Sequence, residues 1–297
     1  MFTGLSAFPL TPLSGETPDE AAFTGLIERL VAARVDSIGV LGSTGHYAYL
    51  KRETRARIAR LACQHSGDIP VIVGIGALTT AEVLACADDA QRAGATGLLL
   101  PAMSYQPLGE AEVFDLFASV DAAVSLPICV YDNPTTTHFQ FSDQLYRRIA
   151  ALPNVASIKI PAVPGSPEQV QTRIAALQSE LPDDVTLGIS GDGSAAAGLN
   201  AGCAAWYSVL GGLFPAAALA ITQAARAGDA AAARRLSADL DPLWALYARH
   251  GGSLRVIATA AAVLGLVNPP CLPRPLHSLD GANRADVAAT LAALNLC

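Results

Sequence analysis

A single lysine stands inside an apolar run of the chain. Of the two lysines, Lys51 lies in the charged segment LKRETRARIAR, whereas Lys159 is flanked by Ile158 and Ile160 in NVASIKIPAV. Burial disfavours the charged form of an amine, and a neutral lysine amine attacks carbonyl carbon to form a Schiff base. The iminium then serves as an electron sink. Lys159 is therefore a candidate nucleophile, and a strand-end lysine paired with a carboxylate is the alternative.

The segment GSTGH, residues 42–46, could bind a small anion. Ser43 and Thr44 stand between two glycines at the turn from an apolar run into a helical pattern. Such a turn offers free backbone N–H groups and two hydroxyls, which suit a carboxylate. An ordinary turn with a Ser/Thr helix cap is the alternative. The anion site gains support because the turn is expected at the same rim as Lys159.

Tyr131 ends the apolar run PICVYDN and is followed by Asp132, Asn133 and Pro134. These three residues predict a tight turn that fixes the direction of the tyrosine. A hydroxyl at this place could reach a bound substrate and transfer protons. A buried tyrosine with a satisfied hydroxyl is the alternative.

Eight apolar runs must position these residues. Each run is near-continuously apolar, which is typical of strands buried on both faces, and each is followed by a segment of helical length. Eight such repeats predict an α/β fold, the (β/α)8 TIM barrel, with an open doubly wound sheet as the alternative. Alternation would then direct Ser157 and Lys159 into the barrel, near the end that carries the chemistry of barrel enzymes. The runs cover residues 5–10, 37–42, 70–76, 97–102, 127–133, 155–161, 185–192 and 205–212.

The predicted barrel occupies residues 1–228, and residues 229–297 form a C-terminal helical region. Three helical segments are expected there, DAAAARRLSADLDPLWALYARH, SLRVIATAAAVLGL and GANRADVAATLAALNL. A Gly-Gly pair and the proline-rich NPPCLPRPL separate them. The fold prediction is thus a TIM barrel with a three-helix appendage.

Composition argues against several classes of function. The net charge of −7 is unfavourable for nucleic acid, which needs a basic face. No apolar run reaches the roughly 18–20 residues of a membrane span, and the amino terminus carries no basic segment before an apolar one. The six cysteines form no CxxC pair or metal-ligand spacing. We therefore expect reduced thiols in a cytoplasmic protein with no nucleic-acid or membrane partner.

Together these motifs resemble the dihydrodipicolinate synthase / N-acetylneuraminate lyase family of class I aldolases. The similarity runs nearly end to end and includes the helical tail. It is carried by TPL (11–13), GSTG (42–45), GIGA (74–77), YDNP (131–134), SIKIP (157–161) and SGDG (190–193).

The resemblance implies a role for each central residue. Lys159 would form a Schiff base with pyruvate or another 2-keto acid, so no metal or separate cofactor is needed. Ser43 and Thr44 would bind the carboxylate of that acid, and Thr44 would also link to Tyr131 in a proton relay. A homotetramer of paired dimers, or a homodimer, is implied as well. Further positions that match pocket-lining residues of the family are Gly191, Asp192 and Tyr207.

The sequence departs from the family pattern at three places. A second relay tyrosine from a neighbouring subunit is expected in a PYY-type segment, but PAMSYQP places Ser104 there, and Tyr105 comes one residue late. His46 replaces the usual glutamate after GSTG. The arginine that holds a second carboxylate is absent, and Thr135, Thr136 and Thr137 follow the motif instead. His46 and His138 offer titratable groups near the pocket mouth, and plain surface histidines are the alternative.

The leading hypothesis is a Schiff-base lyase, an aldolase, synthase or dehydratase, whose second substrate is not aspartate semialdehyde. Arginine suits carboxylates through its bidentate fork, so its loss argues against that substrate. Two alternatives stay open. One is a phosphate-binding barrel isomerase that uses the glycine-rich loops 190–194 and 210–212. The other is a non-catalytic relative that binds a keto acid.

Overall fold

Eight parallel strands close into a barrel in the computed structural model, which describes residues 1–296. The strands follow one another around the ring in chain order. β1 (Gly4–Ala7) closes the ring by pairing with β4 (Ser37–Val40) on one side and with β10 (Ala205–Ser208) on the other. The remaining barrel strands are β5 (Val71–Gly74), β6 (Gly97–Pro101), β7 (Ile128–Tyr131), β8 (Val155–Ile160) and β9 (Thr186–Ile189). The predicted barrel is confirmed, and the open sheet is excluded.

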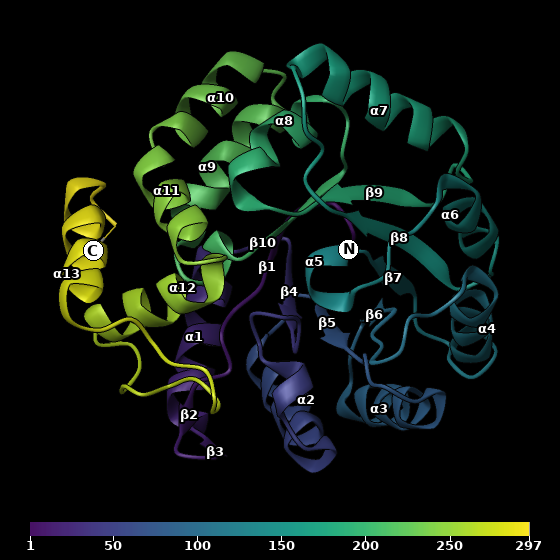
Figure 1. Ribbon diagram of the computed structural model, residues 1–297, viewed down its shortest axis with the longest axis horizontal. Helices are drawn as coiled ribbons and strands as arrows, with labels where there is room; N and C mark the ends of the chain where they lie inside the picture. The colour runs from purple at the N-terminus through teal and green to yellow at the C-terminus, as the bar shows by residue number, and fades with distance from the viewer. Residues whose placement is uncertain (297) are drawn as a thin grey trace.

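Helices surround the barrel and connect consecutive strands (Figure 1). The short α5 (Pro134–Thr137) lies over the centre of the ring in that view. A small antiparallel ribbon, β2 (Leu13–Ser14) with β3 (Thr17–Pro18), follows β1. The other helices of this layer are α1 (Glu20–Ala33), α2 (Arg52–His65), α3 (Thr80–Ala93), α4 (Glu110–Asp121), α6 (Asp143–Ala150), α7 (Pro167–Ser179), α8 (Ala195–Asn200) and α9 (Pro215–Arg226).

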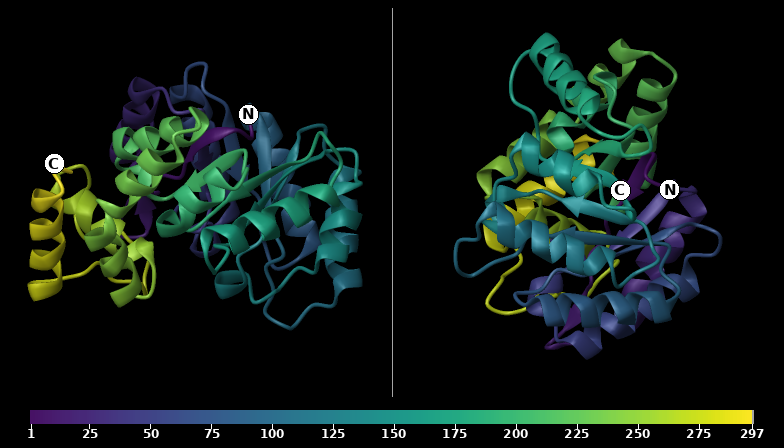
Figure 2. Two further views of the ribbon diagram at one scale, coloured as in Figure 1. Left: turned by 90° about the horizontal axis from the view of Figure 1, so that it is seen from above. Right: turned by 90° about the vertical axis from the view of Figure 1, so that its right-hand side faces the viewer.

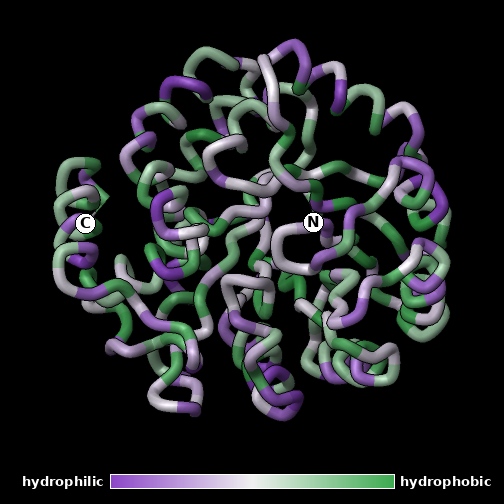
Figure 3. Tube along the Cα trace, in the orientation of Figure 1, coloured by the Kyte–Doolittle hydropathy of each residue, from purple (hydrophilic) through white to green (hydrophobic). Residues whose placement is uncertain are grey.

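Two apolar layers explain why the strands read as continuous apolar runs. One face of each strand packs against the helices, and Ile158 and Ile160 belong to that large outer core. The opposite face fills the barrel interior with a smaller cluster, which includes Phe8, Tyr131 and Tyr207. Figure 3 shows hydrophobic residues on the central strands and hydrophilic ones mainly on the outer turns of the helices. A strand buried on both sides therefore needs no polar alternation.

Helix caps set where the connecting helices begin and end. Asp19 accepts a hydrogen bond from Ala22 N at 3.0 Å at the start of α1, and Thr79 accepts one from Glu82 N at 3.2 Å at the start of α3. Gly94 ends α3 with φ 88°, in the left-handed region that the sequence predicts for a glycine C-cap. Such local signals keep the strand-to-helix loops short.

Four helices, rather than the predicted three, follow α9 in the described residues. They are α10 (Ala230–Ala238), α11 (Asp241–Arg249), α12 (Ser253–Val263) and α13 (Gly281–Ala293). The first predicted helix divides after Ala238, and Pro242 occupies the first turn of α11, the helical position where a missing N–H costs nothing. α10 packs against α8 and α9, whereas α13 lies at the far end of the molecule (Figure 2).

No helix within residues 1–296 combines the length and the apolar character needed to cross a bilayer.

Candidate active site

Lys159 points into the barrel from β8. Its strand neighbour in register is Tyr131 of β7, and Ser157 faces Cys129 one layer below. The lysine is 7% exposed, and its Nζ lies 4.2 Å from the ring centroid of Tyr131 and 4.3 Å from that of Phe8. Within residues 1–296 the ammonium has no carboxylate partner at ion-pair distance. The paired-lysine alternative is therefore not what the structure shows.

Aromatic faces take the place of a counter-ion around this amine. A cation over an aromatic ring is attracted by the ring quadrupole, with a strength of about 0.5–2 kcal/mol that depends on desolvation. Such an attraction is weaker than a buried ion pair and leaves the lone pair free to react once the proton has gone. The surrounding rings thus hold the Lys159 side chain in place and leave its Nζ without an ion-pair partner within residues 1–296.

Tyr131 presents its hydroxyl beside the GSTG loop. The hydroxyl lies 2.9 Å from Ser43 Oγ, and Asn133 Nδ2 donates a hydrogen bond to it at 3.0 Å. Burial raises the pKa of the Tyr131 phenol, but the Lys159 ammonium and the hydrogen bonds from Ser43 and Asn133 outweigh burial and bring that pKa below its ordinary value. The phenol is therefore a better proton donor than a free tyrosine.

The hydroxyl that contacts Tyr131 belongs to Ser43, which corrects the predicted Thr44 link. Thr44 is buried, and its side chain makes no hydrogen bond to other described residues. The loop turns sharply at this point: Leu41 adopts φ 57°, and a Cβ built on Gly74 would stand 1.9 Å from the Leu41 carbonyl oxygen. In such an irregular loop, neighbouring side chains do not alternate as they do along a strand.

Asp192 is buried and held by hydrogen bonds from β10 and the loop that follows it. Its carboxylate accepts hydrogen bonds from Trp206 Nε1, Ser208 Oγ and the backbone N–H groups of Val209 and Leu210, at 2.8–3.2 Å. Burial raises the pKa of Asp192 to about 6, and these donors oppose the rise. Its contact with substrate stays a prediction, and these four donors already occupy the carboxylate within the protein.

The same contacts weigh against a phosphate site in the last barrel loops. The amides of Val209 and Leu210 already donate to Asp192, and Gly211 N donates to Ser208 Oγ at 2.8 Å. A phosphate would have to displace a buried carboxylate from these donors, and its own charge would be repelled by that carboxylate.

Tyr207 lies in the layer beneath the lysine. Its ring centroid is 5.7 Å from Lys159 Nζ, and its hydroxyl is 2.6 Å from Ser157 Oγ and accepts a weak bond from Cys129 Sγ at 3.3 Å. The ring thus forms the floor of the site, while the hydroxyl is turned away from it. Gly191 lies at the end of β9 with φ 87°, where a side chain would be strained.

The two predicted histidines occupy different environments. His46 is 1% exposed, and neither ring nitrogen has a hydrogen-bond partner in the described structure. Burial lowers the pKa of His46 to about 4, so the ring is neutral at physiological pH. His138 is exposed and ends α5, and Thr136 in the same helix is exposed too. Thr136 nevertheless stands close enough to Tyr131 to lower the pKa of its phenol, whereas no contact of His138 with the site is shown.

Tyr105 extends away from its own barrel. It is 87% exposed and lies in the loop after β6. Its contribution to the site of a neighbouring subunit stays a prediction.

Phe8 and Asn133 complete the site and were missed from the sequence. Phe8 stands in a continuous apolar run, where nothing distinguishes it from a core residue. Asn133 belongs to the YDNP motif, but its residue type indicated only a turn. The signal that could have revealed Asn133 is its spacing, since a side chain two residues after Tyr131 can reach back to the same hydroxyl.

A separate cavity of about 460 Å³ opens on the outer side of this rim. It is lined by Asp132 and Ile160, the chain neighbours of Tyr131 and Lys159, together with residues of α6 and α7. Because successive side chains of a strand point to opposite faces, this cavity lies between the barrel and its helices. No cluster of three or more His, Cys, Asp or Glu placed to hold a metal occurs in residues 1–296.

Comparison with known proteins tests the resemblance directly. The model of the dihydrodipicolinate synthetase family matches residues 1–294. The chain belongs to this family. It is 31% identical over 300 residues to the 4-hydroxy-tetrahydrodipicolinate synthase of Hyphomonas neptunium, covering 99% of this chain and all of that one. It is 28% identical over 293 residues to YagE of Escherichia coli, whose assignment as a 2-dehydro-3-deoxy-D-gluconate aldolase is provisional; this covers 94% and 92% of the two chains.

Solved structures of family members show the same architecture. A dihydrodipicolinate synthase from Agrobacterium tumefaciens superposes with a TM-score of 0.94 at 46% identity, over 99% of this chain and 98% of that one. YagE in complex with pyruvate superposes with a TM-score of 0.90 at 27% identity over the full length of both chains. The predicted family membership is therefore confirmed.

Proposed function

We propose that this protein is a Schiff-base-forming lyase that acts on pyruvate or another 2-keto acid. The observation that carries the proposal is a lysine inside a closed barrel, 7% exposed, with aromatic rings around its Nζ and no carboxylate of residues 1–296 at ion-pair distance. The family members named above are synthases and an aldolase, and YagE has been solved with pyruvate. These relatives support the same reaction class.

The proposed reaction gives each group a step. Neutral Lys159 Nζ adds to the C2 carbonyl of the keto acid, and the proton that the nitrogen loses passes to the carbonyl oxygen. When this oxygen leaves as water, it needs a second proton, and the hydroxyl of Tyr131 supplies it. The Tyr131 phenolate left by this transfer takes a C3 proton from the iminium, which gives an enamine and restores the phenol. The enamine adds to an aldehyde; in the reverse direction, carbon–carbon cleavage forms the same enamine and releases the aldehyde. In this proposal Ser43 and the backbone amides of the GSTG loop bind the carboxylate of the keto acid.

The second substrate is proposed to lack the carboxylate of aspartate semialdehyde. Residues 135–138 are Thr-Thr-Thr-His, so no guanidinium follows the tyrosine motif. Hydroxyls and the exposed His138 suit a hydroxylated aldehyde or a deoxy-keto acid better than a second carboxylate. The aldolase name of YagE is consistent with such a substrate.

We also propose a homodimer, which could pair further into a tetramer. Apart from Met1, the large apolar side chains exposed within residues 1–296 are Tyr49, Leu78 and Tyr105. They lie in the loops after three successive strands, β4, β5 and β6, and we call them the rim patch. Exposed apolar groups that gather on one face indicate a contact surface.

Cytoplasmic location remains our expectation, and five of the six cysteines are described as free thiols.

Reductive trapping tests the proposed reaction. Sodium borohydride with pyruvate should add the mass of a reduced pyruvate imine to the peptide that contains Lys159. The only other lysine, Lys51, lies outside the barrel and serves as an internal control. Lys159→Arg should abolish trapping, whereas Lys51→Arg should preserve it. A wild-type protein that resists labelling under conditions that label a known aldolase would overturn the proposal, and trapping without turnover of any aldehyde would favour the non-catalytic alternative.

A further inference from the structure

The cavity between the barrel and the helices α6 and α7 has room for a small ligand. Its volume of about 460 Å³ falls within the range of ligand sites, roughly 300–1,000 Å³. The lining includes neither Tyr131 nor Lys159, so the cavity is separate from the candidate active site. Its lining residues are Asp132, Pro134, Gln140, Phe141, Tyr146, Ile160, Pro161, Ala162, Val163, Pro164, Arg173 and Leu177.

The lining runs from exposed residues at the mouth of this cavity to buried residues at its inner end. The exposed lining residues are Gln140, Ala162, Pro164 and Arg173. The buried ones are Asp132, Phe141, Tyr146, Ile160 and Leu177. Asp132 is the charged member of the buried set. The inner end therefore carries a carboxylate among apolar and aromatic side chains.

The carboxylate of Asp132 has a hydrogen-bond donor but no cation. The side chain is 4% exposed. Its Oδ2 accepts a hydrogen bond from the Tyr146 hydroxyl, whereas its Oδ1 has no hydrogen-bond partner within residues 1–296. No basic group of these residues lies at ion-pair distance from it. Because a carboxylate has about four acceptor sites, most of the acceptor capacity of Asp132 is unused.

Arg173, the cation at the mouth, already has a carboxylate of its own. Its two terminal nitrogens donate to Asp143 at 2.6 Å each, the bidentate arrangement that guanidinium groups favour. This pair is neutral as a whole, so it leaves the charge of Asp132 unbalanced. Burial raises the pKa of Asp132, and the Tyr146 hydroxyl opposes the rise. A cation inside the cavity would oppose it further.

Aromatic and aliphatic walls beside the carboxylate suit an apolar body. The rings of Phe141 and Tyr146 stack with centroids 5.3 Å apart and an interplanar angle of 8°. Ile160 and Leu177 line the same buried part of the cavity. Ligand sites of this kind bury the apolar part of a ligand and orient it through a few polar groups. Here the orienting group is an acceptor, so the ligand needs a donor.

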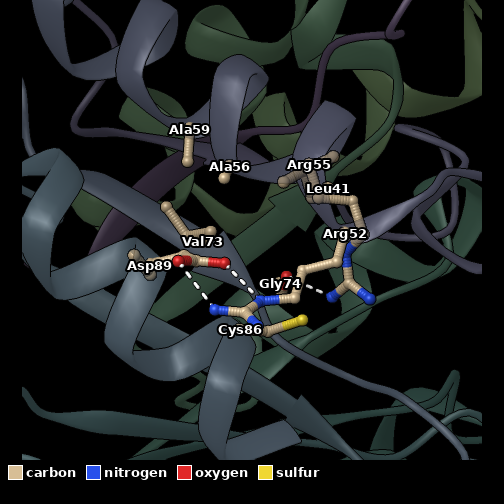
Figure 4. A pocket seen from close by; sticks show the side chains of 10 residues that line it. Leu41, Arg52, Arg55, Ala56, Ala59, Val73, Gly74, Cys86 and Asp89 are labelled. Atoms are coloured by element: carbon tan, nitrogen blue, oxygen red, sulfur yellow. Dashed lines mark hydrogen bonds and ion pairs between the residues drawn. The ribbon is translucent and has the colours of Figure 1, made fainter. Parts of the chain in front are cut away.

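A second hollow, lined by residues of α2 and α3, contains charged side chains that already have partners (Figure 4). Arg52 Nε lies 2.7 Å from a carboxylate oxygen of Asp89, and Arg55 donates to the carbonyls of Gly74 and Gly76. The volume of this hollow is about 10 Å³, which is room for about one water molecule. The unbalanced charge and the space for a ligand therefore occur together in the larger cavity.

We propose that the larger cavity binds a small organic cation, an ammonium or amidinium group on a short apolar body. Its N–H groups donate to the Asp132 carboxylate, and its body packs against the walls described above. The proposal goes beyond the proposed function and does not depend on it. The backbone N–H of Asp132 donates to the Lys159 carbonyl at 3.0 Å. The ligand thus lies directly behind the strands that carry Tyr131 and Lys159.

Three probes of similar shape and different charge test the proposal. Benzamidine is a cation near neutral pH, benzamide is neutral and benzoate is an anion. Calorimetric titration of the full chain should give a benzamidine Kd of about 1 mM or tighter. Benzamide should bind at least about 10-fold more weakly, because its donors are uncharged, and benzoate more weakly still. Preferred binding of benzoate would assign the cavity to Arg173 and overturn the proposal, as would a wild-type protein that does not bind benzamidine.

Saturating pyruvate locates the bound probe. It should leave the affinity for benzamidine unchanged, because neither Tyr131 nor Lys159 lines the cavity. Displacement of benzamidine by pyruvate would place the probe in the barrel mouth and overturn the proposal. Failure of borohydride trapping at Lys159 would instead overturn the proposed function and leave the titration result intact.

Matched variants identify the carboxylate. Asp132→Asn keeps the shape of the side chain and removes its charge, so it should weaken benzamidine binding by about 10-fold or more and abolish the preference over benzamide. Asp121→Asn removes a buried carboxylate of α4 that does not line the cavity, and it should bind benzamidine as wild type does. Wild-type affinity in a folded Asp132→Asn protein would overturn the proposal.

A cavity-filling variant keeps the test valid if Asp132→Asn fails to fold. Val163 is a half-buried lining residue in the loop after β8. Val163→Trp puts a large side chain into the cavity without a change of charge, and it should abolish benzamidine binding. Retained wild-type affinity in this variant would show that the probe binds elsewhere and would overturn the proposal.

Discussion

At the scale of single residues, the acidity of the Tyr131 hydroxyl depends on the groups that contact it. Tyr131 is bonded by Ser43 and Asn133 and lies against the Lys159 ammonium. Each of these contacts favours the phenolate over the phenol, and together they overcome the opposite effect of burial on its pKa. Proton donation by Tyr131 is thus a property of its neighbours rather than of tyrosine itself.

The paired substitutions Ser43→Ala and Thr44→Ala test this assignment. Ser43→Ala removes the hydroxyl that bonds Tyr131 and should lower the maximal rate of pyruvate deuterium exchange by about 10–100-fold. Thr44→Ala leaves that contact intact and should act mainly on the pyruvate concentration for half-saturation. The rates are measured by proton NMR at saturating pyruvate. A larger loss of maximal rate in Thr44→Ala would restore the link predicted from the sequence.

The sequence placed Lys159 and Tyr131 correctly, but it could not choose between Ser43 and Thr44. Strand alternation has a period of two, so the inward direction of Lys159 follows from the position of its strand alone. The GSTG loop has no such period, because Leu41 is in the left-handed region there. The hydrogen-bond partners of Asp192 could not be predicted for a similar reason. They come from β10 and the loop after it, and no local sequence pattern indicates them.

At the scale of elements, β4 and the segment after β1 must fit closely for the lysine to be covered. Phe8 follows β1 and lies 4.3 Å from Lys159 Nζ. A Cβ built on Gly39 of β4 would stand 2.3 Å from Phe8 Cζ. The glycine is therefore required by close approach within the barrel. The strands themselves could be predicted because continuous apolar runs need no partner information, whereas this fit between two strands could not.

Gly39→Ala should disturb the amine through Phe8. The new methyl group would push the ring out of its place, which costs roughly 1–3 kcal/mol for overpacking and should slow borohydride trapping at Lys159. Gly25→Ala in α1 is the matched control, because no atom of residues 1–296 outside its own helix turn lies within 4 Å of a Cβ built there. This variant should gain up to about 1 kcal/mol in its free energy of unfolding. Urea unfolding measures the stabilities. Unchanged stability and trapping in Gly39→Ala would show that Phe8 adapts.

At the scale of the whole molecule, the proposed dimer would use the rim patch as its contact surface. Tyr49, Leu78 and Tyr105 leave the same rim that holds the site, so a partner seated there would also cover the mouth. The double substitution Leu78→Arg and Tyr105→Arg should yield monomers, because like charges would face each other across a twofold interface. Light scattering on a sizing column measures the mass. An unaltered oligomer would place the interface elsewhere.

Acid stability is also a property of the whole fold, and His46 makes a defined contribution to it. The pKa of this ring is about 4 in the folded chain and about 6.5 when unfolded. Between these values the unfolded chain binds a proton that the folded chain excludes, so folding free energy is lost as the pH falls from about 6.5 to 4. At about 1.4 kcal/mol per pH unit, the loss is on the order of 3 kcal/mol.

His46→Gln should remove most of this loss, since an amide does not titrate. Urea unfolding of both proteins at one fixed protein concentration, at pH 7 and near pH 4, gives the comparison. Asp192 acts in the opposite direction, because its raised pKa of about 6 means that the folded state holds a proton between about pH 4 and 6. This contribution is present in both proteins and cancels in the difference. If the free energy of unfolding depends on pH equally in the two proteins, His46 must bind a protein partner or water in solution. Burial would then not hold its ring neutral.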